Sequence, residues 1–172
     1  TNDFYKSETY EDISKVLMQI GDKKESLFIA SKISIPQKKD EAYYNLSKIL
    51  IDCGDRNGFF KLVHKISNNR FKSKAYLNLY RSTMKTSEIE ESKLAIQSSL
   101  KFASSIKDFG EKSIVFGEIS KILFDFGDKK KYMFAIQELN RASSEIIDNF
   151  EKSNAYLNLA IVYAQKDILN KS

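Results

Sequence analysis

A short pattern that recurs five times along the 172-residue chain constrains its fold more than any other feature. The pattern is clearest at residues 40–55, DEAYYNLSKILIDCGD, where apolar residues at helical spacing lead into a Gly-Asp pair. Aligning the copies on one central apolar position gives five markers, which are Ile13, Leu46, Leu79, Ile119 and Leu159. The steps between markers of 33, 33, 40 and 40 residues indicate a repeat protein, in which neighbouring units bury each other's apolar faces.

Each of the first four copies predicts an amphipathic helix, a tight turn and a second helix, and the fifth predicts a first helix without a complete partner. At residues 21–22, 54–55 and 127–128, glycine is expected to close the first helix in the left-handed conformation, and aspartate to cap the second. In the third copy Ser87-Glu88 replaces this pair, and we expect Ser87 to cap the helix with Glu90 in the third position. With only one proline and six glycines, the chain is predicted to be all-α, with about nine helices.

The change of period falls inside the second helices. Their closing markers, each 13 residues before the next central marker, are Ile33, Ile66, Ile106 and Ile146. The longer repeats therefore carry their extra residues in the helices near 88–107 and 128–147, which we predict to be about two turns longer than their counterparts. We expect a single domain over residues 1–172, with repeats at about 3–35, 36–68, 69–107 and 108–147 and a final helix at 148–166.

Composition narrows the class of protein. The single cysteine excludes an internal disulfide framework and favours a reducing compartment, so we expect a cytoplasmic protein. The apolar runs are too short and too often broken by charge for a transmembrane helix, so no membrane partner is expected. The 28 basic residues are interspersed with 23 acidic ones, and this mixed surface disfavours a nucleic-acid-binding protein.

Candidate catalytic or cofactor-binding residues are lacking in the sequence. His64 is the only histidine and stands near no recognisable nucleophile pattern. Cys53, next to Gly54, is interpreted as a small buried hydrophobic residue at a helix end. Neither residue has metal-site spacing, and no glycine-rich phosphate-binding loop is found. We therefore predict neither an enzyme nor a cofactor.

The copies resemble tetratricopeptide repeats (TPR). EAYYNL at 41–46, KAYLNL at 74–79 and NAYLNL at 154–159 are similar to the opening pattern of that family, and Gly54-Asp55 follows Leu46 at the family's turn position. The resemblance implies an α-solenoid of antiparallel helix pairs in a TPR-like right-handed superhelix. The second helices depart from the family, because Ile33 and Ile66 stand where it usually has a small residue. A looser solenoid of helical hairpins is the alternative.

By analogy with the family, the first helices line a concave surface. The positions just before and just after each central marker are expected to face this surface. Those positions hold three rows, which are Asn45, Asn78 and Asn158; Lys15, Lys48, Arg81 and Lys121; and Tyr44, Leu77 and Leu157. Asparagine can hydrogen-bond a peptide backbone and the basic row suits carboxylates. The predicted peptide-binding residues are Tyr44, Asn45, Lys48, Leu77, Asn78, Arg81, Lys121 and Asn158. The alternative is that the asparagines bond the backbone of the adjoining helix and the basic residues form a solvated face.

A fourth row lies in the first turns of the first helices, where lysine recurs as Lys6, Lys39, Lys72, Lys112 and Lys152. Cations are disfavoured at that end of a helix. We expect the lysine stems to cover apolar surface between repeats, with their ammonium groups paired to preceding acids such as Glu111 and Glu151. The alternative is that the lysines form a ladder that contacts phosphate or an acidic partner.

Three hypotheses for function follow. The leading one is a protein–protein interaction scaffold or chaperone-like adaptor that holds a peptide segment with acidic groups on the concave face. The second is a self-assembly module within a larger repeat array, because the last helix lacks a complete partner and is expected to leave Ile161, Val162 and Ile168 uncovered. The third, disfavoured by the mixed charge, is a nucleic-acid-binding helical repeat protein.

Overall fold

The structure, a computed structural model, describes residues 2–169, with the backbone alone for residues 165–169. This part of the chain forms nine helices and no strand, in agreement with the all-α prediction. In chain order the helices are α1 (Asn2–Gln19), α2 (Lys23–Ser31), α3 (Pro36–Asp52), α4 (Arg56–Val63), α5 (Asn69–Thr86), α6 (Ile89–Ser104), α7 (Phe109–Asp125), α8 (Lys129–Glu145) and α9 (Asn149–Leu169).

Three of the turns between a first helix and its second helix have the predicted Gly-Asp geometry. The glycines at 21, 54 and 127 have φ angles of 92°, 72° and 72°, which an L residue adopts only with strain. The side chains of Asp22, Asp55 and Asp128 accept hydrogen bonds from the backbone N–H groups of Glu25, Gly58 and Lys131. The repeated dipeptide therefore ends one helix and starts the next.

The turn between α5 and α6 corrects the expected role of Ser87. This residue does not cap α6; it has a φ of 61° and takes the place of the glycine. Glu88 is the N-cap residue and makes no side-chain capping hydrogen bond. The turn requires positive φ at this position, and serine adopts it at a cost of about 1 kcal/mol relative to glycine.

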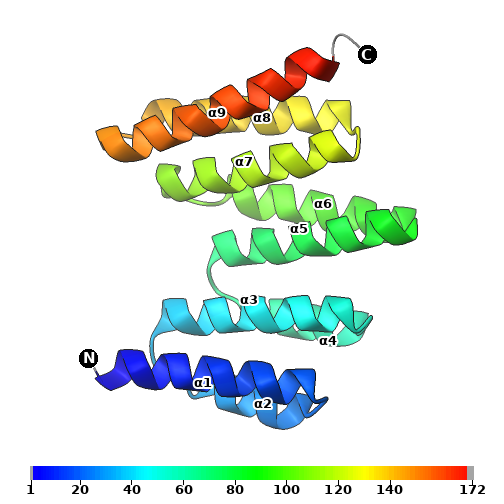
Figure 1. Cartoon of the computed structure of the whole chain (residues 1–172), viewed down its shortest axis with the longest axis vertical. Coiled ribbons are helices and arrows are strands. Elements are labelled where there is room, and N and C mark those ends of the chain that lie inside the picture. Colours follow the sequence, from blue (N-terminus) through cyan, green and yellow to red (C-terminus); the bar gives the residue numbers. More distant parts are fainter. Residues whose placement is uncertain (1, 170–172) are drawn as a thin grey trace.

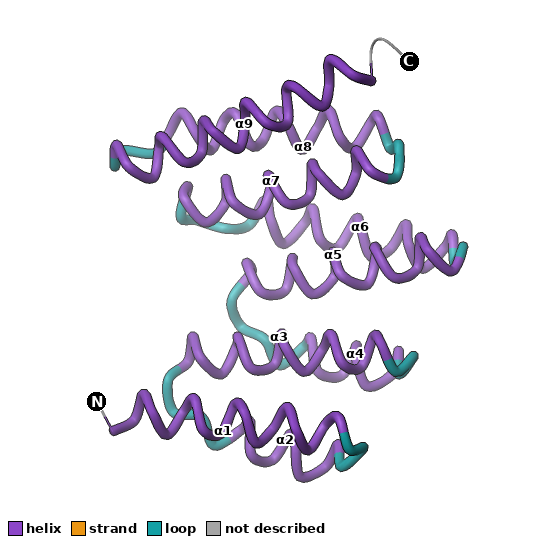
Figure 2. Tube along the Cα trace, in the orientation of Figure 1, coloured by secondary structure: helices purple, strands orange, loops and turns teal. Residues whose placement is uncertain are grey.

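The lengths of the second helices follow the prediction from the period. α2 and α4 contain 9 and 8 residues, whereas α6 and α8 contain 16 and 17. The connections between pairs also agree, since Pro36 occupies the first turn of α3 and Asp108 and Asp148 cap the helices that follow them. Figure 2 shows how short the loops are between these helices.

The first helices α1, α3, α5, α7 and α9 lie one after another along the long axis of the molecule (Figure 1). Each packs on the next in this row, and α2, α4, α6 and α8 each pack on the first helix of their own pair. The two ends of the chain lie at opposite ends of the row. One face of the molecule is therefore built from first helices alone.

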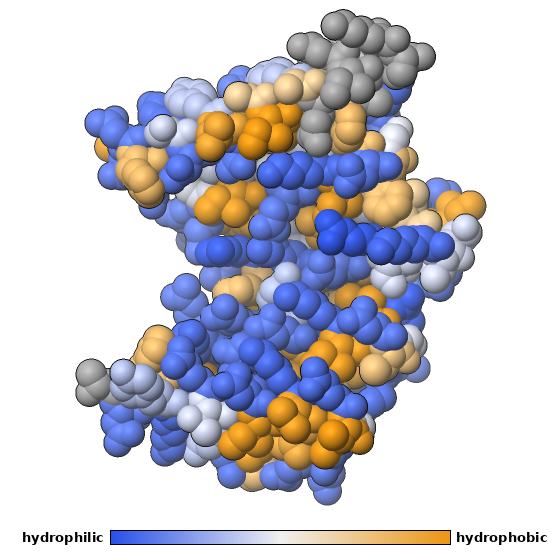
Figure 3. All heavy atoms as spheres, in the orientation of Figure 1, coloured by the Kyte–Doolittle hydropathy of each residue, from blue (hydrophilic) through white to orange (hydrophobic). Residues whose placement is uncertain are grey.

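The central markers form the core between these helices, with one exception. Leu46, Leu79, Ile119 and Leu159 are at most 4% exposed. Ile13, at the same place in α1, is 42% exposed, so its predicted burial is wrong. In the described part of the chain no helix packs on the outer side of α1, and hydrophobic side chains gather on the surface at that end (Figure 3).

The exposed apolar residues of the last helix are only partly the ones expected. Ile161 is exposed, as predicted, but Val162 is fully buried in the core. Its backbone carbonyl also accepts a hydrogen bond of 2.6 Å from the Tyr132 hydroxyl of α8. The third residue expected there, Ile168, lies outside the described side chains.

Two of the five lysines of this row lie over aromatic rings, and none of the five forms an ion pair with a described acid. The Lys6 and Lys72 ammonium groups lie over the rings of Tyr10 and Phe102 at 5.9 and 5.4 Å from the ring centres. Within the described residues Glu111 pairs with Arg70 instead, at 3.2 Å. The expected ion pairs of this row are therefore wrong, because the acids at the starts of the helices face other repeats.

The residue after the lysine is buried in α1, α3, α5 and α7, whereas Ser153 in α9 is exposed, and one of the four buried residues has a different role from the rest. Ser7, Ser73 and Ser113 bond backbone carbonyls, whereas Asp40 stands at the same place in α3. Its carboxylate accepts hydrogen bonds of 2.9 and 2.8 Å from the N–H groups of Ser67 and Asn68. Asp40 therefore fixes the loop that joins α4 to α5.

Candidate functional site

A pocket of about 470 Å³ lies on the first-helix face, where α3, α5 and α7 meet. It is lined by Tyr44, Lys48, Lys74, Leu77, Asn78, Arg81, Glu118, Lys121 and Ile122. Six of the eight predicted site residues are among them. Repeats that are 33 and 40 residues apart in sequence thus bring these side chains to one place.

A second pocket of about 300 Å³ continues the first along α3 and α5. It is lined by Lys48, Ile51, Asp52, Asn78, Arg81, Ser82 and Lys85. Because Lys48, Asn78 and Arg81 line both pockets, the two form one continuous depression, which we call the central groove. The surface over α3, α5 and α7 is largely hydrophilic, in contrast to the hydrophobic surface on α1 (Figure 3).

The two remaining predicted residues do not line the central groove, although Asn45 Oδ1 accepts a hydrogen bond of 3.2 Å from Lys48 Nζ. Asn45 donates a hydrogen bond of 2.9 Å from Nδ2 to Glu11 Oε1 of α1, and it does not line the central groove. Asn158 of α9 lines a separate pocket of about 230 Å³, together with Arg70 and several acidic residues. The three asparagines therefore do not line one groove together, as the prediction of a single concave row expected.

The asparagines contact the preceding repeat. Asn78 Nδ2 lies 3.3 Å from the Tyr44 hydroxyl oxygen, which accepts its hydrogen bond, just as Glu11 accepts one from Asn45. Asn158 packs on Gly117, where an added Cβ would lie 3.8 Å from the asparagine Cβ. The alternative interpretation, that asparagine bonds the adjoining helix, is thus correct in part, although the partners are side chains rather than backbone groups.

The floor of the central groove is apolar. Leu77 and Ile122 are buried, and the half-buried ring of Tyr44 packs on Phe71 with ring centres 5.7 Å apart. The Lys48 ammonium group lies over the Tyr44 ring at 4.3 Å, in the range of a cation–π contact. An apolar floor with polar groups at its edges is the usual composition of a ligand site.

The charge on the edges is not balanced. Lys48, Arg81, Lys85 and Lys121 form no ion pair with any described residue, whereas Lys74 pairs with Glu118 at 2.9 Å. Asp52 is the one other acid among the lining residues of the two pockets. The central groove therefore carries a net excess of positive charge.

The equivalent lysine in α1 is neutralised. Lys15 lies 2.7 Å from Glu11 and 3.7 Å from Asp12. Burial alone would lower the pKa of Lys15, but the hydrogen bond and charge of Glu11 outweigh burial and raise it. Glu11 stands one helical turn before Lys15, and the residues at its place in α3, α5 and α7 are Tyr44, Leu77 and Gly117. Because no acid stands at that place in these three helices, Lys48, Arg81 and Lys121 have no ion-pair partner there.

The lining residues that the sequence analysis did not predict are Ile51, Asp52, Lys74, Ser82, Lys85, Glu118 and Ile122. The signal for two of them was present, because Lys74 and Lys85 lie four and seven residues from Asn78 on the same stripe of α5. Extending each predicted row by one helical turn in both directions would have included them.

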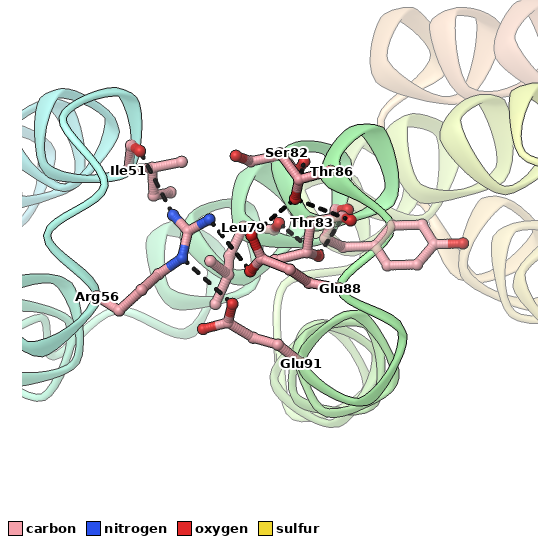
Figure 4. Close-up of polar contacts among 9 residues, drawn as sticks. Ile51, Arg56, Leu79, Ser82, Thr83, Thr86, Glu88 and Glu91 are labelled. Carbon is pink, nitrogen blue, oxygen red and sulfur yellow. Dashed lines mark hydrogen bonds and ion pairs between the residues drawn. The ribbon is translucent and has the colours of Figure 1, made fainter.

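A polar cluster behind the central groove fixes the second repeat against the third (Figure 4). Arg56 at the start of α4 lies 3.2 Å from Glu91 and 3.5 Å from Glu88, and its Nη1 donates to the Ile51 carbonyl at 3.4 Å. Hydrogen bonds from Glu91 and Thr86 lower the pKa of Glu88, while burial and the contact with Glu88 raise that of Glu91. Two carboxyl groups thus share one guanidinium, which helps to set the distance between α3 and α5.

Other chemistry finds little support in the described residues. They contain no group of three or more His, Cys, Asp or Glu residues arranged to hold a metal ion. Cys53 is exposed at the end of α3, so its predicted burial is wrong, and His64 is exposed as well. None of the described helices has both the length and the hydropathy needed to cross a membrane.

Comparison with known proteins gives no family for this chain. No family model, curated protein or solved structure matches it. The central groove and the repeats of the chain therefore provide the indications of its function.

Proposed function

We propose that this protein is an interaction scaffold or chaperone-like adaptor that binds a peptide segment in the central groove. The observation that carries the proposal is the convergence of Lys48, Arg81 and Lys121 from three successive first helices on one groove with an apolar floor. Unpaired cations beside buried Leu77 and Ile122 suit a segment that carries both acidic and aliphatic side chains.

The architecture we propose for this role is an α-solenoid of antiparallel helix pairs that form a TPR-like right-handed superhelix. It is supported by the row of first helices, by the Gly-Asp turns and by the resemblance of residues 41–46, 74–79 and 154–159 to the opening pattern of that family. In such stacks the first helices present an extended binding surface. A cytoplasmic location, with partners in the same compartment, is part of this proposal.

The test compares two variants of equal charge. The groove variant carries Lys48→Ala, Arg81→Ala and Lys121→Ala, and the control carries Lys65→Ala, Lys101→Ala and Lys107→Ala, at exposed positions outside the central groove. Asn45 and Asn78 are left in place because they bond neighbouring repeats. Each protein is immobilised, and partners captured from an extract of the source organism are identified by mass spectrometry.

We expect partners that the unmodified protein and the control both capture and that the groove variant loses. Circular dichroism must show that both variants keep the helical content of the unmodified protein. Equal capture by the groove variant and the control would refute the central groove as the binding site.

A second candidate function, self-assembly through the C-terminal end, is favoured by the exposed apolar side chains of α9. Phe150, Tyr156, Leu157 and Ile161 are between 42% and 76% exposed. Light scattering during size-exclusion chromatography over a hundredfold range of concentration tests it. A monomer at every concentration would exclude this function, and a dimer that Leu157→Lys abolishes would support it.

A further inference from the structure

We infer that the segment bound in the central groove is extended, in the polyproline II conformation, and carries an acidic residue at every third position. This inference rests on the proposed function and specifies its ligand. It follows from the place of these cations in the repeat, from their spacing and from the polar side chains of the central groove.

Three of the four groove cations without an ion pair occupy one position of the repeat, and the fourth, Lys85, stands one helical turn after Arg81 on α5. Lys48, Arg81 and Lys121 each stand two residues after the central marker, on α3, α5 and α7. Those helices pack side by side, and all three cations line the same pocket. They form a row that crosses the first helices, one charge for each repeat.

The spacing of the row matches the spacing of side chains in a polyproline II segment. Packed helices lie about 8–10 Å apart, so neighbouring cations of the row are separated by about that distance. A polyproline II segment rises about 3.1 Å per residue with three residues per turn, so every third side chain points to the same side at intervals of about 9 Å. A β-strand would place every third side chain on alternating sides.

The polar side chains of the central groove favour an extended ligand over an α-helix. The backbone N–H and C=O groups of an α-helix bond one another within the helix, so they are not available to side chains of the central groove. A single extended chain is narrower, and its backbone lacks internal hydrogen bonds, which leaves it free to bond polar side chains such as Asn78 and Ser82.

The probes are fluorescein-labelled peptides of equal composition and charge. The spaced peptide is Glu-Pro-Ala-Glu-Pro-Ala-Glu, and the clustered peptide is Glu-Glu-Glu-Pro-Ala-Pro-Ala. Two further probes are a helical peptide with glutamates seven residues apart and a twelve-residue oligouridine. Binding of each to the full chain is measured by fluorescence anisotropy at low and at physiological salt.

We expect the spaced peptide to bind about tenfold more tightly than the clustered one, because the clustered glutamates reach one cation of the row instead of three. Replacing the central glutamate of the spaced peptide by glutamine must remove the effect of Arg81→Ala, since the middle residue faces the middle cation whichever way the peptide runs. That result would locate the peptide on the row residue by residue.

Equal affinity for the spaced and clustered peptides would overturn the inference, and so would tighter binding of the helical peptide or of oligouridine. Absence of binding by every peptide would also overturn it. The proposed function would survive that last result if the captured partners still depend on Lys48, Arg81 and Lys121, so the two failures can be told apart.

Discussion

The helices α1 and α5 occupy equivalent places in the row of first helices, yet they differ in both their apolar and their charged positions. The central residue of α5, Leu79, is 1% exposed, and Arg81 next to it forms no ion pair with a described residue. In α1 the central Ile13 is exposed and Lys15 is neutralised by Glu11. In the middle of the row of first helices, the repeat therefore gives a buried central residue and a cation without an ion pair. At the N-terminal end of the row it gives neither.

The largest difference between the two helices is expected in stability. Leu79→Ala should lower the free energy of unfolding by about 3 kcal/mol, because it leaves a cavity among buried neighbours. Ile13→Ala should cost about 1 kcal/mol or less, since much of that side chain already contacts water. Urea denaturation followed by circular dichroism measures both, and equal losses would contradict the different burial of the two positions.

The turns after the two helices should differ by a smaller amount. Ser87→Gly should raise the stability of the α5–α6 pair by about 0.5–1 kcal/mol, because glycine adopts the observed φ of 61° without strain. Gly21→Ser in the turn between α1 and α2 should lower it by a similar amount. Thermal unfolding of the two variants decides the point. A loss of stability in Ser87→Gly would show that the serine contributes more than its backbone conformation.

The charge difference can be reduced by one substitution. Glu11→Gln keeps an oxygen to accept the hydrogen bond of Asn45 but removes the nearer of the two carboxylates beside Lys15 and leaves Asp12 at 3.7 Å, so it should add part of a fourth charge to the row. A ten-residue peptide with four glutamates at three-residue spacing should then bind about threefold more tightly, as measured by anisotropy. The matched control is Glu8→Gln, which removes an equal charge beside Lys38. Equal gains in both variants would indicate net charge alone.

The smallest effect concerns pH at the boundaries between repeats. Lys23 of the first repeat and the Gly58 N–H hold the pKa of Asp55 below its usual 3.8, so this stabilisation is present above that pH and is lost as pH falls through the lowered pKa. Burial raises the pKa of Glu91 above its usual 4.5, so its contribution is present below pH 4.5 and is lost as pH rises through the raised pKa.

Unfolding free energies at pH 3, 5 and 7 test these opposite signs. Between pH 5 and 7, Glu91→Gln should lose less stability than the unmodified protein. Between pH 5 and 3, Asp55→Asn should lose less. Both differences should stay below about 1 kcal/mol, because these groups are partly exposed. Identical pH profiles for the two variants would contradict the assignment.

Much of the fold could be predicted because its signals are local. The Gly-Asp pairs fix the turns through φ and capping, and the period places the extra residues of α6 and α8 inside helices. The row of Lys48, Arg81 and Lys121 was predicted for the same reason, since equivalent positions of a repeat share one face.

The errors share a different cause. Ile13 and Cys53 are exposed, and Asn45 bonds a side chain of the preceding first helix. None of these outcomes is set by spacing within one repeat. Each depends on which neighbour lies against it, and that arrangement is tertiary.

The short second helices α2 and α4 have a consequence for how the molecule opens. They contain about half as many residues as α6 and α8, so the first two pairs hold less buried surface between their helices. Their amides should exchange with solvent through local opening faster than those of the later pairs. The central groove spans α3, α5 and α7. A bound segment would therefore link the second helix pair, which opens more readily, to the third and fourth pairs, which open less readily. Ligand protection measured by hydrogen–deuterium exchange should therefore be greater in α3 than in α7.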